Sequence, residues 1–572
     1  METAEKLITE HLDVWTSAVK AKSSAGRGSS KKQHLYGIKK LRKLILQLAV
    51  MGKLVPQDSD DEPASTLLKR ISNERTKLIE DGKLKKQKQP TMPVAEEGGS
   101  PLPEGWARAT FGDVVFNRDS ERIPLSVDAR KTRQGEFDYY GASGVIDSID
   151  DYLFDKPLLL IGEDGANLIN RSTPIAFIAR GKYWVNNHAH VLDGISESLL
   201  FYVCLHINAI SLEPYVTGTA QPKMNQAKMN SIVLAIPPAR EQHRILAKVD
   251  ELMALCDQLE QEQESSLDTH DTLVATLLGA LTTSSAHGSA FAEAWQRIQA
   301  NFDTLFTTES SIDQLKQTIL QLAVMGKLVP QDSEDEPAGD TLVKIESRKE
   351  ELRVSKGIRK TKPFPPVAGD EKRFPIPSNW KWVCPDHLCY QITDGAHHTP
   401  EYVDEGIPFL SVKDMSKRYL DFSSTRYVSP SQHEELIKRC NPEHGDLLLT
   451  KIGTTGIPVV INTEKEFSIF VSVALLKFPQ ELLYSNYFKT AFESPLVKEQ
   501  SDEFTMGVGN KNLVLKHIRN FALPLPPLAE QHRIVAKVDE LMALCDQLKA
   551  SLATAQATQL NLADSLVEEA IG

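Results

Sequence analysis

Two segments of this chain occur twice with almost no change, and this duplication limits the possible folds more than any other feature of the sequence. Residues 45–64, ILQLAVMGKLVPQDSDDEPA, recur at 319–338 with one exchange. Residues 241–259, EQHRILAKVDELMALCDQL, recur at 530–548, again with one exchange. The chain is therefore two copies of one plan, in which a helix and a basic linker precede a variable block, a Pro-Pro pair and a long helix.

The repeated segments have the periodicity of helices. Apolar residues three and four apart form a narrow stripe at Ile38, Leu41, Ile45 and Leu48, and again at Ile312, Leu315, Ile319 and Leu322. After each Pro-Pro pair, a second stripe has the heptad spacing of a coiled coil, at Ile245, Val249, Leu252, Cys256 and Leu259, and at Ile534, Val538, Leu541, Cys545 and Leu548. We expect these second helices to have about 35 to 40 residues and to span roughly 50 to 60 Å.

Near-identity of the repeated helices extends to all of their faces. An ordinary helical bundle would show the same apolar stripes, and periodicity alone favours that interpretation. A bundle does not require its outer residues to stay the same in two copies, however. The repetition therefore indicates an outer surface that contacts a second, duplicated partner.

The blocks between the repeats have no visible common sequence. The match ends after Trp106 and Trp380, and it returns only at Pro237-Pro238 and Pro526-Pro527. Each block is rich in short β-type runs separated by turn residues, which predicts mixed α/β domains. The two blocks diverge while the repeats that flank them stay nearly identical, which indicates that each block meets a different functional requirement.

Tight turns in the blocks carry polar groups beside glycines, in the strings YYGASG, GEDGAN, DGAHHTP and KIGTTG. Such loops suit the reading of base edges, although they are equally the ordinary turns of a β-rich domain. The residues expected on or near a DNA face are Tyr139, Tyr140, Ser143, Asn167, Gln221, Lys223 and Asn225 in the first block, and His397, His398, Lys451, Thr455, Asn510 and Lys511 in the second. The Lys/Arg-rich linkers at 82–89 and 347–362 fit either solvated connections or contacts with phosphates.

Catalytic motifs are missing from the sequence. It contains no GxxxxGK[ST], GxGxxG, HExxH or GxSxG string and no Asn-Pro-Pro-Phe quartet, so we expect neither catalytic residues nor a metal site. The six cysteines lack paired spacing and are expected to be reduced. With 65 basic and 77 acidic residues the net charge is −12, which argues against indiscriminate coating of nucleic acid. No apolar run is long enough to span a membrane, and we expect a soluble cytoplasmic protein.

These motifs resemble the specificity (S) subunit of type I restriction-modification enzymes over essentially the whole chain, and the A-type (IB) subfamily in particular. The most specific strings are LQLAVMGKLVPQ and PPxxEQHRI, each present twice, with YYGASG, GEDGAN and TAQPKMN. The resemblance implies a non-catalytic subunit whose blocks are target recognition domains, each reading half of a bipartite DNA site. It also implies two modification subunits that methylate adenine N6 from S-adenosylmethionine, and restriction subunits that use ATP and Mg, with no cofactor bound by this chain.

The fold expected is α+β, with two mixed α/β target recognition domains joined by long repeated helices that form an antiparallel coiled coil with a pseudo-twofold internal repeat. The expected domains are an N-terminal extension (1–37), a conserved helix with a basic linker (38–99), target recognition domain 1 (100–238), a central conserved region with long helices and a basic linker (239–371), target recognition domain 2 (372–527) and a C-terminal conserved helix (528–572). The alternatives are a coiled-coil scaffold whose two domains bind ligands other than DNA, and a self-contained DNA methyltransferase or nuclease.

Overall fold

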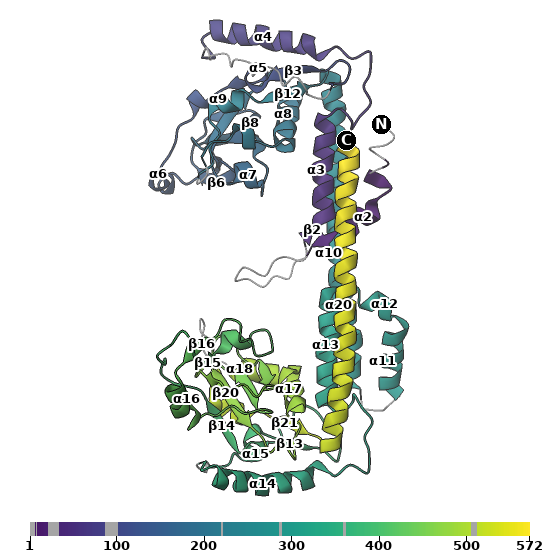
Figure 1. Cartoon of the computed structure of the whole chain (residues 1–572). Helices are drawn as coiled ribbons and strands as arrows, with labels where there is room; N and C mark the ends of the chain where they lie inside the picture. Colours follow the sequence, from purple (N-terminus) through teal and green to yellow (C-terminus); the bar gives the residue numbers. More distant parts are fainter. Residues whose placement is uncertain are drawn as a thin grey trace. The chain divides into compact units, whose positions relative to one another are not determined.

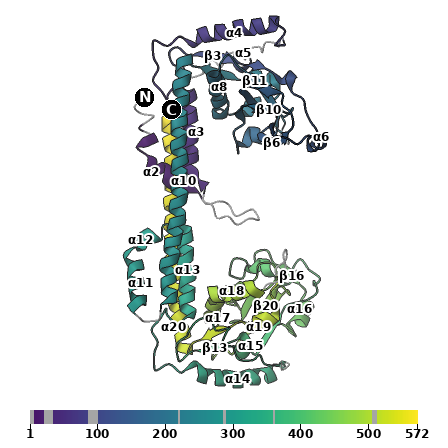
Figure 2. The same ribbon diagram turned by 180° about the vertical axis from the view of Figure 1, so that it is seen from behind.

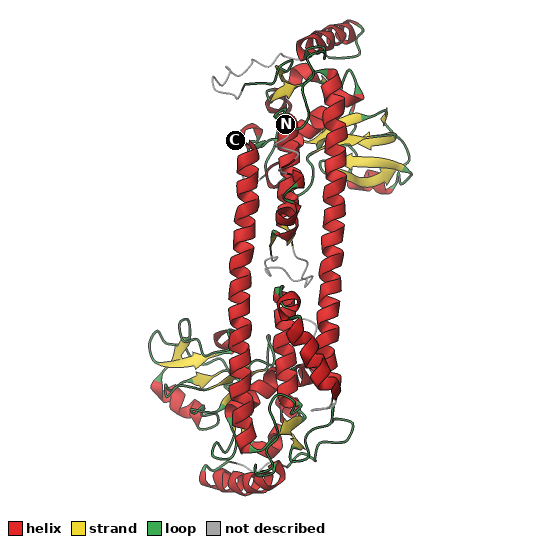
Figure 3. Ribbon diagram, turned by 90° about the vertical axis from the view of Figure 1, so that its right-hand side faces the viewer, coloured by secondary structure: helices red, strands yellow, loops and turns green. Residues whose placement is uncertain are grey.

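The two longest helices are α10 (Ala239–Thr283) and α20 (Leu528–Ile571), which run without interruption for 45 and 44 residues (Figures 1 and 3). Each begins directly after a Pro-Pro pair, as predicted, and each is longer than predicted. The computed structural model describes residues 6, 8–20, 34–85, 101–218, 221–284, 289–358, 362–504 and 512–571. Among these residues no helix is both long and apolar enough to cross a membrane.

The chain divides into two units, and the long helices contribute to both. Unit 1 comprises Met1–Ser266 and Thr554–Gly572, and unit 2 comprises Leu267–Ala553. Each unit therefore contains one variable block, one half of α10 and one part of α20. In each unit a continuous apolar core extends from the helices into the block.

In unit 1, helix α3 (Tyr36–Val50) packs against the first half of α10 in the opposite direction. Arg42 near the start of α3 donates to Asp257 at 2.6 Å, whereas Gln57 beyond the end of α3 donates to Glu241 at 3.2 Å. The predicted stripe of α3 is buried in this contact.

The same helix runs parallel to the last turns of α20. Tyr36 donates to Asp564 at 2.9 Å, and the ammonium of Lys53 donates to the carbonyl oxygen of Ile571 at 3.0 Å. Because α3 is antiparallel to α10 and parallel to α20, the two long helices are antiparallel within unit 1. This confirms the predicted antiparallel packing.

Unit 2 repeats this arrangement around α13 (Glu309–Val324). The contacts that fix its directions are Lys549 with Asp313 at 2.6 Å, Gln331 with Glu530 at 2.5 Å, Ser310 with Asp271 at 3.3 Å and Lys327 with the carbonyl oxygen of Thr282 at 2.6 Å. Helix α13 is thus antiparallel to α20 and parallel to the second half of α10. Both α3 and α13 end at a glycine in the left-handed region, Gly52 and Gly326, each with φ of +68°.

The first variable block, called domain 1 below, has three sheets, with strand orders β6-β5-β10-β7, β4-β11-β8-β9 and β12-β3. Its elements are β3 (Ala107–Thr110), α5 (Phe111–Val114), β4 (Phe116–Asn117), η1 (Asp119–Glu121), α6 (Val127–Lys131), β5 (Phe137–Gly141), β6 (Gly144–Ile149), β7 (Phe154–Asp155), β8 (Leu158–Gly162), α7 (Asn167–Asn170), β9 (Ala176–Ala179), β10 (Lys182–Val185), β11 (Ala189–Asp193), α8 (Glu197–Ala209), η2 (Glu213–Tyr215), α9 (Gln226–Asn230) and β12 (Val233–Ile236). Helix α8 lies between α3 and the strands β8 and β9 (Figures 1 and 2).

The second variable block, called domain 2 below, also has three sheets, with strand orders β16-β15-β19, β14-β20-β17-β18 and β13-β21. Its elements are β13 (Lys381–Val383), α15 (Pro385–Leu388), β14 (Gln391–Asp394), β15 (Ile407–Leu410), η3 (Val412–Met415), β16 (Arg426–Val428), α16 (Pro430–Ile437), β17 (Leu447–Thr450), β18 (Pro458–Val460), β19 (Ser468–Ile469), β20 (Val473–Lys477), α17 (Ser485–Glu493), α18 (Pro495–Phe504), α19 (Leu515–Arg519) and β21 (Leu523–Leu525).

The two domains share one topology although their sequences do not match. In both, a four-stranded antiparallel sheet has a fully buried strand near its centre, LLLIG in β8 and LLLT in β17. A second sheet contains one parallel pair, β5 with β10 and β15 with β19. A two-stranded sheet, β3 with β12 and β13 with β21, joins the first and last strands of each block. Chain duplication therefore extends through the blocks at the level of the backbone.

A further helix precedes each domain, α4 (Ala64–Glu80) and α14 (Ala338–Ser355). Helix α14 includes most of the second predicted basic linker. Lys349 and Arg353 on this helix are buried, and they donate to the carbonyl oxygens of Asp386 at 2.8 Å and Tyr390 at 3.1 Å. These two cations fix α14 to the domain, so they are not free to contact phosphates, and the interpretation of this stretch as a linker is wrong.

The remaining elements are short. They are α2 (Leu12–Ser17), β1 (Val19–Lys20) and β2 (His34–Leu35) in the N-terminal region, and α11 (Ser289–Ala300) with α12 (Phe302–Leu305) between α10 and α13. Trp15 of α2 is fully buried in the core of unit 1. Its carbonyl oxygen lies so close to Gly37 that a Cβ there would be 2.3 Å from it, which is why the second residue of α3 is a glycine.

Candidate nucleic-acid interface

Four loops of domain 1 meet at one end of the sheet β4-β11-β8-β9. Backbone hydrogen bonds join them: Glu163 N–H donates to the His188 oxygen at 2.9 Å, Met224 N–H to the Glu163 oxygen at 2.9 Å, and Asn186 N–H to the Tyr140 oxygen at 3.1 Å. The strings GEDGAN, TAQPKMN and YYGASG, which are far apart in the sequence, are thereby brought together. The fourth loop, residues 186–188 between β10 and β11, was not predicted from the sequence.

The same four loops meet in domain 2, with the same backbone hydrogen bonds. Lys451 N–H donates to the Ser472 oxygen at 2.8 Å, Leu513 N–H to the Lys451 oxygen at 2.8 Å, and Phe470 N–H to the Leu410 oxygen at 2.9 Å. The corresponding positions are Glu163 and Lys451, His188 and Ser472, Met224 and Leu513, Asn186 and Phe470, and Tyr140 and Leu410. We call these two ends of the sheets the loop ends.

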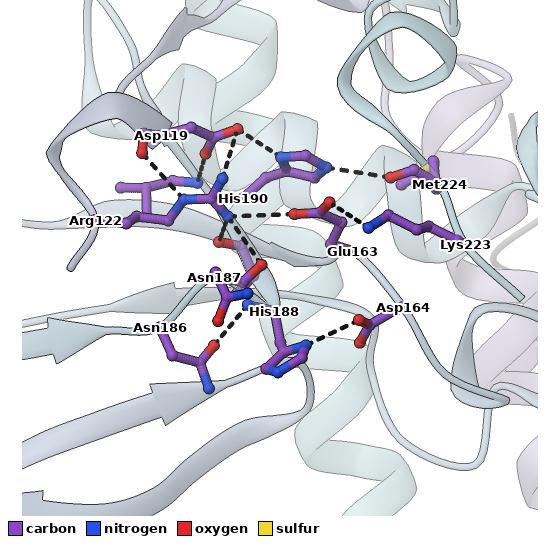
Figure 4. Close-up of polar contacts among 12 residues, drawn as sticks. Asp119, Arg122, Glu163, Asp164, Asn186, Asn187, His188, His190, Lys223 and Met224 are labelled. Carbon is purple, nitrogen blue, oxygen red and sulfur yellow. Dashed lines mark hydrogen bonds and ion pairs between the residues drawn. The ribbon is translucent and has the colours of Figure 1, made fainter. Parts of the chain in front are cut away.

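Charged side chains hold the loop end of domain 1 together (Figure 4). His190 Nδ1 lies 2.7 Å from Asp119, and Arg122 lies 3.4 Å from Asp119 and 3.3 Å from Glu163. Lys223 reaches Glu163 at 3.1 Å from the loop opposite. Burial alone would raise the pKa of Asp119, but the hydrogen bond from His190 and the charge of Arg122 hold it below its ordinary value.

A different set of charged side chains holds the loop end of domain 2 together. The carboxylate of Asp394 is buried and accepts hydrogen bonds from Lys451 at 2.6 Å, from Arg439 at 2.7 Å and from His397 at 3.0 Å. Burial alone would raise the pKa of Asp394, but its hydrogen bonds to Lys451 and His397 lower it. The side chains of Arg439 and His397 are about half exposed, so this cluster places two nitrogen groups at the surface of the loop end.

Six of the residues predicted for the DNA face are exposed at the loop ends or on the loops that form them: Ser143, Gln221, Lys223, Asn225, His397 and His398. Asn225 is also engaged, because its side chain accepts the Lys228 N–H and begins α9. Two more, Asn167 and Thr455, are half-buried in these loops. Asn167 bonds with both the N–H and the carbonyl oxygen of Thr173, so its amide stabilises its own turn.

Three predicted residues are not free surface groups. Tyr139 is fully buried, and its hydroxyl oxygen accepts the Leu125 N–H at 3.2 Å, so it belongs to the core. Tyr140 is partly buried and stacks on Phe177 at 5.8 Å. Lys451 is buried in its ion pair and does not present a free ammonium. Asn510 and Lys511 lie outside the described residues.

Reasoning from the sequence missed several groups at the loop ends. His188 has a half-exposed ring whose Nδ1 is held by Asp164 at 2.8 Å, and Asn187 beside it is exposed (Figure 4). The string NNHAH at 186–190, polar residues between two β-type runs, could have identified this loop. Arg439 follows helix α16, and no local pattern marks it.

The chemistry available at the loop ends is hydrogen bonding and charge. Among the described residues no group of three or more His, Cys, Asp or Glu side chains could hold a metal ion. All six cysteines are free, and burial raises the pKa of Cys204 to about 12, which makes it an inert thiol. The loop ends can therefore recognise a polar partner by donating and accepting hydrogen bonds.

Comparison with known proteins identifies a family for this chain. The family model of the type I restriction modification DNA specificity domain matches residues 103–269 and 396–555. The chain is 36% identical to the type I restriction enzyme EcoEI specificity subunit of Escherichia coli, over 99% of both proteins, and 36% identical to the EcoAI specificity subunit of the same organism, over 100% of both. A solved structure of an HsdS subunit from Thermoanaerobacter tengcongensis is 18% identical, covers 83% of this chain and 98% of its own, and has a TM-score of 0.37.

Two DNA specificity domains in one chain define a protein whose role is sequence specificity rather than catalysis. The chain belongs to the family of specificity subunits of type I restriction enzymes. Its two α/β blocks are the target recognition domains of that family.

Proposed function

We propose that each target recognition domain reads one half of a bipartite DNA site through its loop end. The observation that carries this proposal is that the two domains have one topology and one pattern of backbone hydrogen bonds at the loop ends, with different side chains in corresponding positions. A constant backbone with variable polar groups is what two separate base sequences require, because base edges are distinguished by donors and acceptors.

Exposed nitrogen groups at both loop ends support DNA as the partner despite the acidic composition. Lys223 and His188 are exposed at the loop end of domain 1, and Arg439 and His397 at that of domain 2. Each of these nitrogen groups is held by a carboxylate, which fixes its direction before binding. Side chains ordered in advance lose less conformational entropy when they contact a base or a phosphate.

We further propose that the chain assembles with two modification subunits and with restriction subunits in the cytoplasm. Several residues are exposed on α10 and α20 and are nevertheless identical in the two copies, for example Asp250 and Glu251, with Asp539 and Glu540. Internal packing does not explain them, whereas one partner bound at both copies does. The modification subunits would supply adenine-N6 methylation with S-adenosylmethionine, and the restriction subunits would use ATP and Mg, with no cofactor held by this chain.

Exchange of a recognition domain tests the proposal. Residues 100–238 would be replaced by the corresponding block of a relative, and adenine methylation would be mapped in cells that also express the modification subunit. We expect one half of the methylated motif to change and the other half to persist. The matched experiment replaces residues 372–527 and should change the other half. A swap that altered both halves, or a wild-type complex that methylated no bipartite motif, would contradict the proposal.

A further inference from the structure

The duplicated segments meet at one place in each unit. In unit 1, the buried carboxylate of Glu241 on α10 accepts the indole N–H of Trp106 at 3.0 Å and the amide of Gln57 at 3.2 Å. Gln57 follows α3, Trp106 precedes the first strand of domain 1, and Glu241 follows its last strand. Three segments that are far apart in the sequence therefore meet at this carboxylate. We call Gln57, Trp106 and Glu241 the junction of unit 1.

Unit 2 contains the same junction. The carboxylate of Glu530 accepts the indole N–H of Trp380 at 2.8 Å and the amide of Gln331 at 2.5 Å. Both glutamates are almost completely buried, and burial raises the pKa of each carboxyl. The segments on the two sides of a block recur at different offsets, yet their side chains meet in the same way. This geometry accounts for the identity of Gln57 and Glu241 with Gln331 and Glu530 in the two repeats.

Neighbouring duplicated residues reinforce each junction. Their contacts are Arg244 with Asp61 at 2.7 Å and Arg533 with Asp335 at 2.5 Å, Gln242 with the Pro237 oxygen and Gln531 with the Pro526 oxygen, both at 3.0 Å, and the Ala64 N–H with the Gly105 oxygen at 2.8 Å and the Ala338 N–H with the Asn379 oxygen at 2.9 Å. The left-handed glycines also belong here, since a Cβ on Gly52 would lie 3.0 Å from the Trp106 ring.

The junction lies where each domain is joined to its long helix. The chain enters domain 1 through Trp106 and β3 and leaves it through β12, Pro237 and Pro238, and these two strands pair with each other. Two strands alone form a weak connection that can bend. Apolar packing of α8 on α3 stabilises the contact between domain and helix but does not fix the orientation of the domain, because apolar contacts are non-directional. Buried hydrogen bonds to a carboxylate have both strength and a required geometry.

From these observations we infer that the Trp–Glu–Gln junction fixes the orientation of each recognition domain on its long helix, and that it thereby sets how strictly the chain discriminates the spacing of two half-sites. The inference rests on the proposed reading of a bipartite site. It assigns Trp106, Glu241, Trp380 and Glu530 as positioning residues that do not contact DNA. A domain whose orientation is fixed can meet its half-site at one spacing only, whereas a domain that can bend tolerates neighbouring spacings.

The test uses the full chain in its complex with the modification subunit. Cells would carry a plasmid library in which the two methylated half-sites are separated by the native spacing or by one base pair more or less. For W106F and E241Q we expect both half-site sequences to persist, while the preference for the native spacing over its neighbours falls by about tenfold, the size expected for loss of one hydrogen bond to a charged group. W380F and E530Q should act in the same way through domain 2.

Two controls separate orientation from stability. V249A removes buried methyl groups from the same helix away from the junction, and E264Q changes an exposed carboxylate on that helix that is not duplicated in α20. Both should keep the wild-type spacing preference, even where V249A lowers the melting temperature as much as W106F does. Hydrogen exchange at β3 and β12 should rise in W106F and not in V249A.

The outcomes that would overturn the inference are distinct from those that would overturn the proposed function. Folded W106F with an unchanged spacing preference, or V249A with the same loosened preference, would reject the junction as the positioning element. If E241Q did not assemble, W106F would decide, because phenylalanine retains most of the buried ring. Absence of any bipartite motif in the wild type would instead reject the proposed function.

Discussion

Glu163 and Lys451 occupy the same backbone position in the two recognition domains and carry opposite charges. The N–H of each residue donates to a carbonyl oxygen in the loop before the neighbouring strand, that of His188 or Ser472. The carbonyl oxygen of each residue accepts an N–H from the loop opposite, that of Met224 or Leu513. Glu163 is neutralised by Arg122 and Lys223, and Lys451 by Asp394. The charge at this position is thus balanced separately inside each domain, so one backbone supports two different loop ends.

Reversal of the charge at Glu163 should therefore unfold the loop end of domain 1. In E163K, a third cation would join Arg122 and Lys223, and only Asp119 beside Arg122 would remain to balance them, so we expect a loss of about 3 to 5 kcal/mol in the free energy of unfolding. Denaturant unfolding monitored by tryptophan fluorescence measures this loss. E136K, which reverses the charge of an exposed glutamate of the same domain, should change stability by less than about 0.5 kcal/mol. Equal effects of the two variants would contradict the role assigned to Glu163.

The duplicated lysines that follow α3 and α13 bind the carbonyl groups at the ends of the long helices. Lys327 is buried and donates to the oxygens of Thr282 and Ser284, each at 2.6 Å, whereas Lys53 is only half-buried and its contacts are longer. K327M should cost about 1 to 3 kcal/mol, because it leaves helix-end carbonyls without a partner, and K53M should cost less. Thermal unfolding of both variants checks the order. A larger loss of stability in K53M than in K327M would show that burial of the lysine does not determine its contribution to stability.

Asp394 gives domain 2 a defined dependence on pH. The fold lowers its pKa below the ordinary value of 3.8, so the ionised carboxylate is favoured in the folded state. Its contribution to stability is present above the ordinary pKa, and it is lost as the pH falls through the lowered pKa. D394N, which leaves buried Lys451 without a charge partner, should be destabilised by about 3 to 5 kcal/mol at pH 7. The difference from the wild type should shrink as the pH approaches 2, and a constant difference would contradict the ion pair as its source.

DNA binding should distinguish the exposed loop residues from the buried one. K223A removes an exposed cation, and if Lys223 contacts a phosphate, the slope of log binding constant against log salt should decrease in magnitude by about 0.9. Y139F removes a hydroxyl from the core, so it should reduce stability and leave that slope unchanged. Fluorescence anisotropy with the methylated target over a range of salt concentrations measures both. The assignment of the loop end as the DNA face would fail if K223A, N225A and H188A all bound as the wild type does.

Length of the antiparallel helices should set the gap between half-sites. Four residues inserted after Leu259 of α10, with a matched insertion in α20 that keeps the helices paired, add about 6 Å of helix. Since each base pair contributes about 3.4 Å, the preferred gap should grow by one or two base pairs while both half-sites persist. Mapping of methylated adenines reveals the gap directly. An active complex with an unchanged gap would show that the helices do not determine it.

The helices could be predicted from the sequence because their signals are local. The stripes at Ile38 and Ile245 repeat every three or four residues, and both are buried as expected. The common topology of the recognition domains could not be predicted, because a sheet requires only that buried strands stay apolar. LLLI in β8 and LLLT in β17 meet that requirement without any wider identity.

The loop ends could be predicted only in part. Glycine-containing turns identified two of the four loops in domain 1 and the family string TAQPKMN a third, but Tyr139 was assigned to the surface because it stands beside a turn. Successive residues of a strand point to opposite faces, so one tyrosine of the pair at 139 and 140 had to face inward. Arg439 could not be found, since its partner Asp394 lies 45 residues away in the sequence.

The last turns of α20 complete a unit that begins at the other end of the chain, and this has a consequence for folding during synthesis. Tyr36 and Asp564, which bond to each other, are separated by 528 residues. The helical support of domain 1 therefore stays incomplete until the segment around Asp564 has been synthesised, whereas unit 2 is one uninterrupted stretch, Leu267–Ala553. Ala563 and Leu566 of α20 are the last buried residues of the unit 1 core along the sequence, so the core surface that they cover is exposed to aggregation and to chaperone capture until they are made.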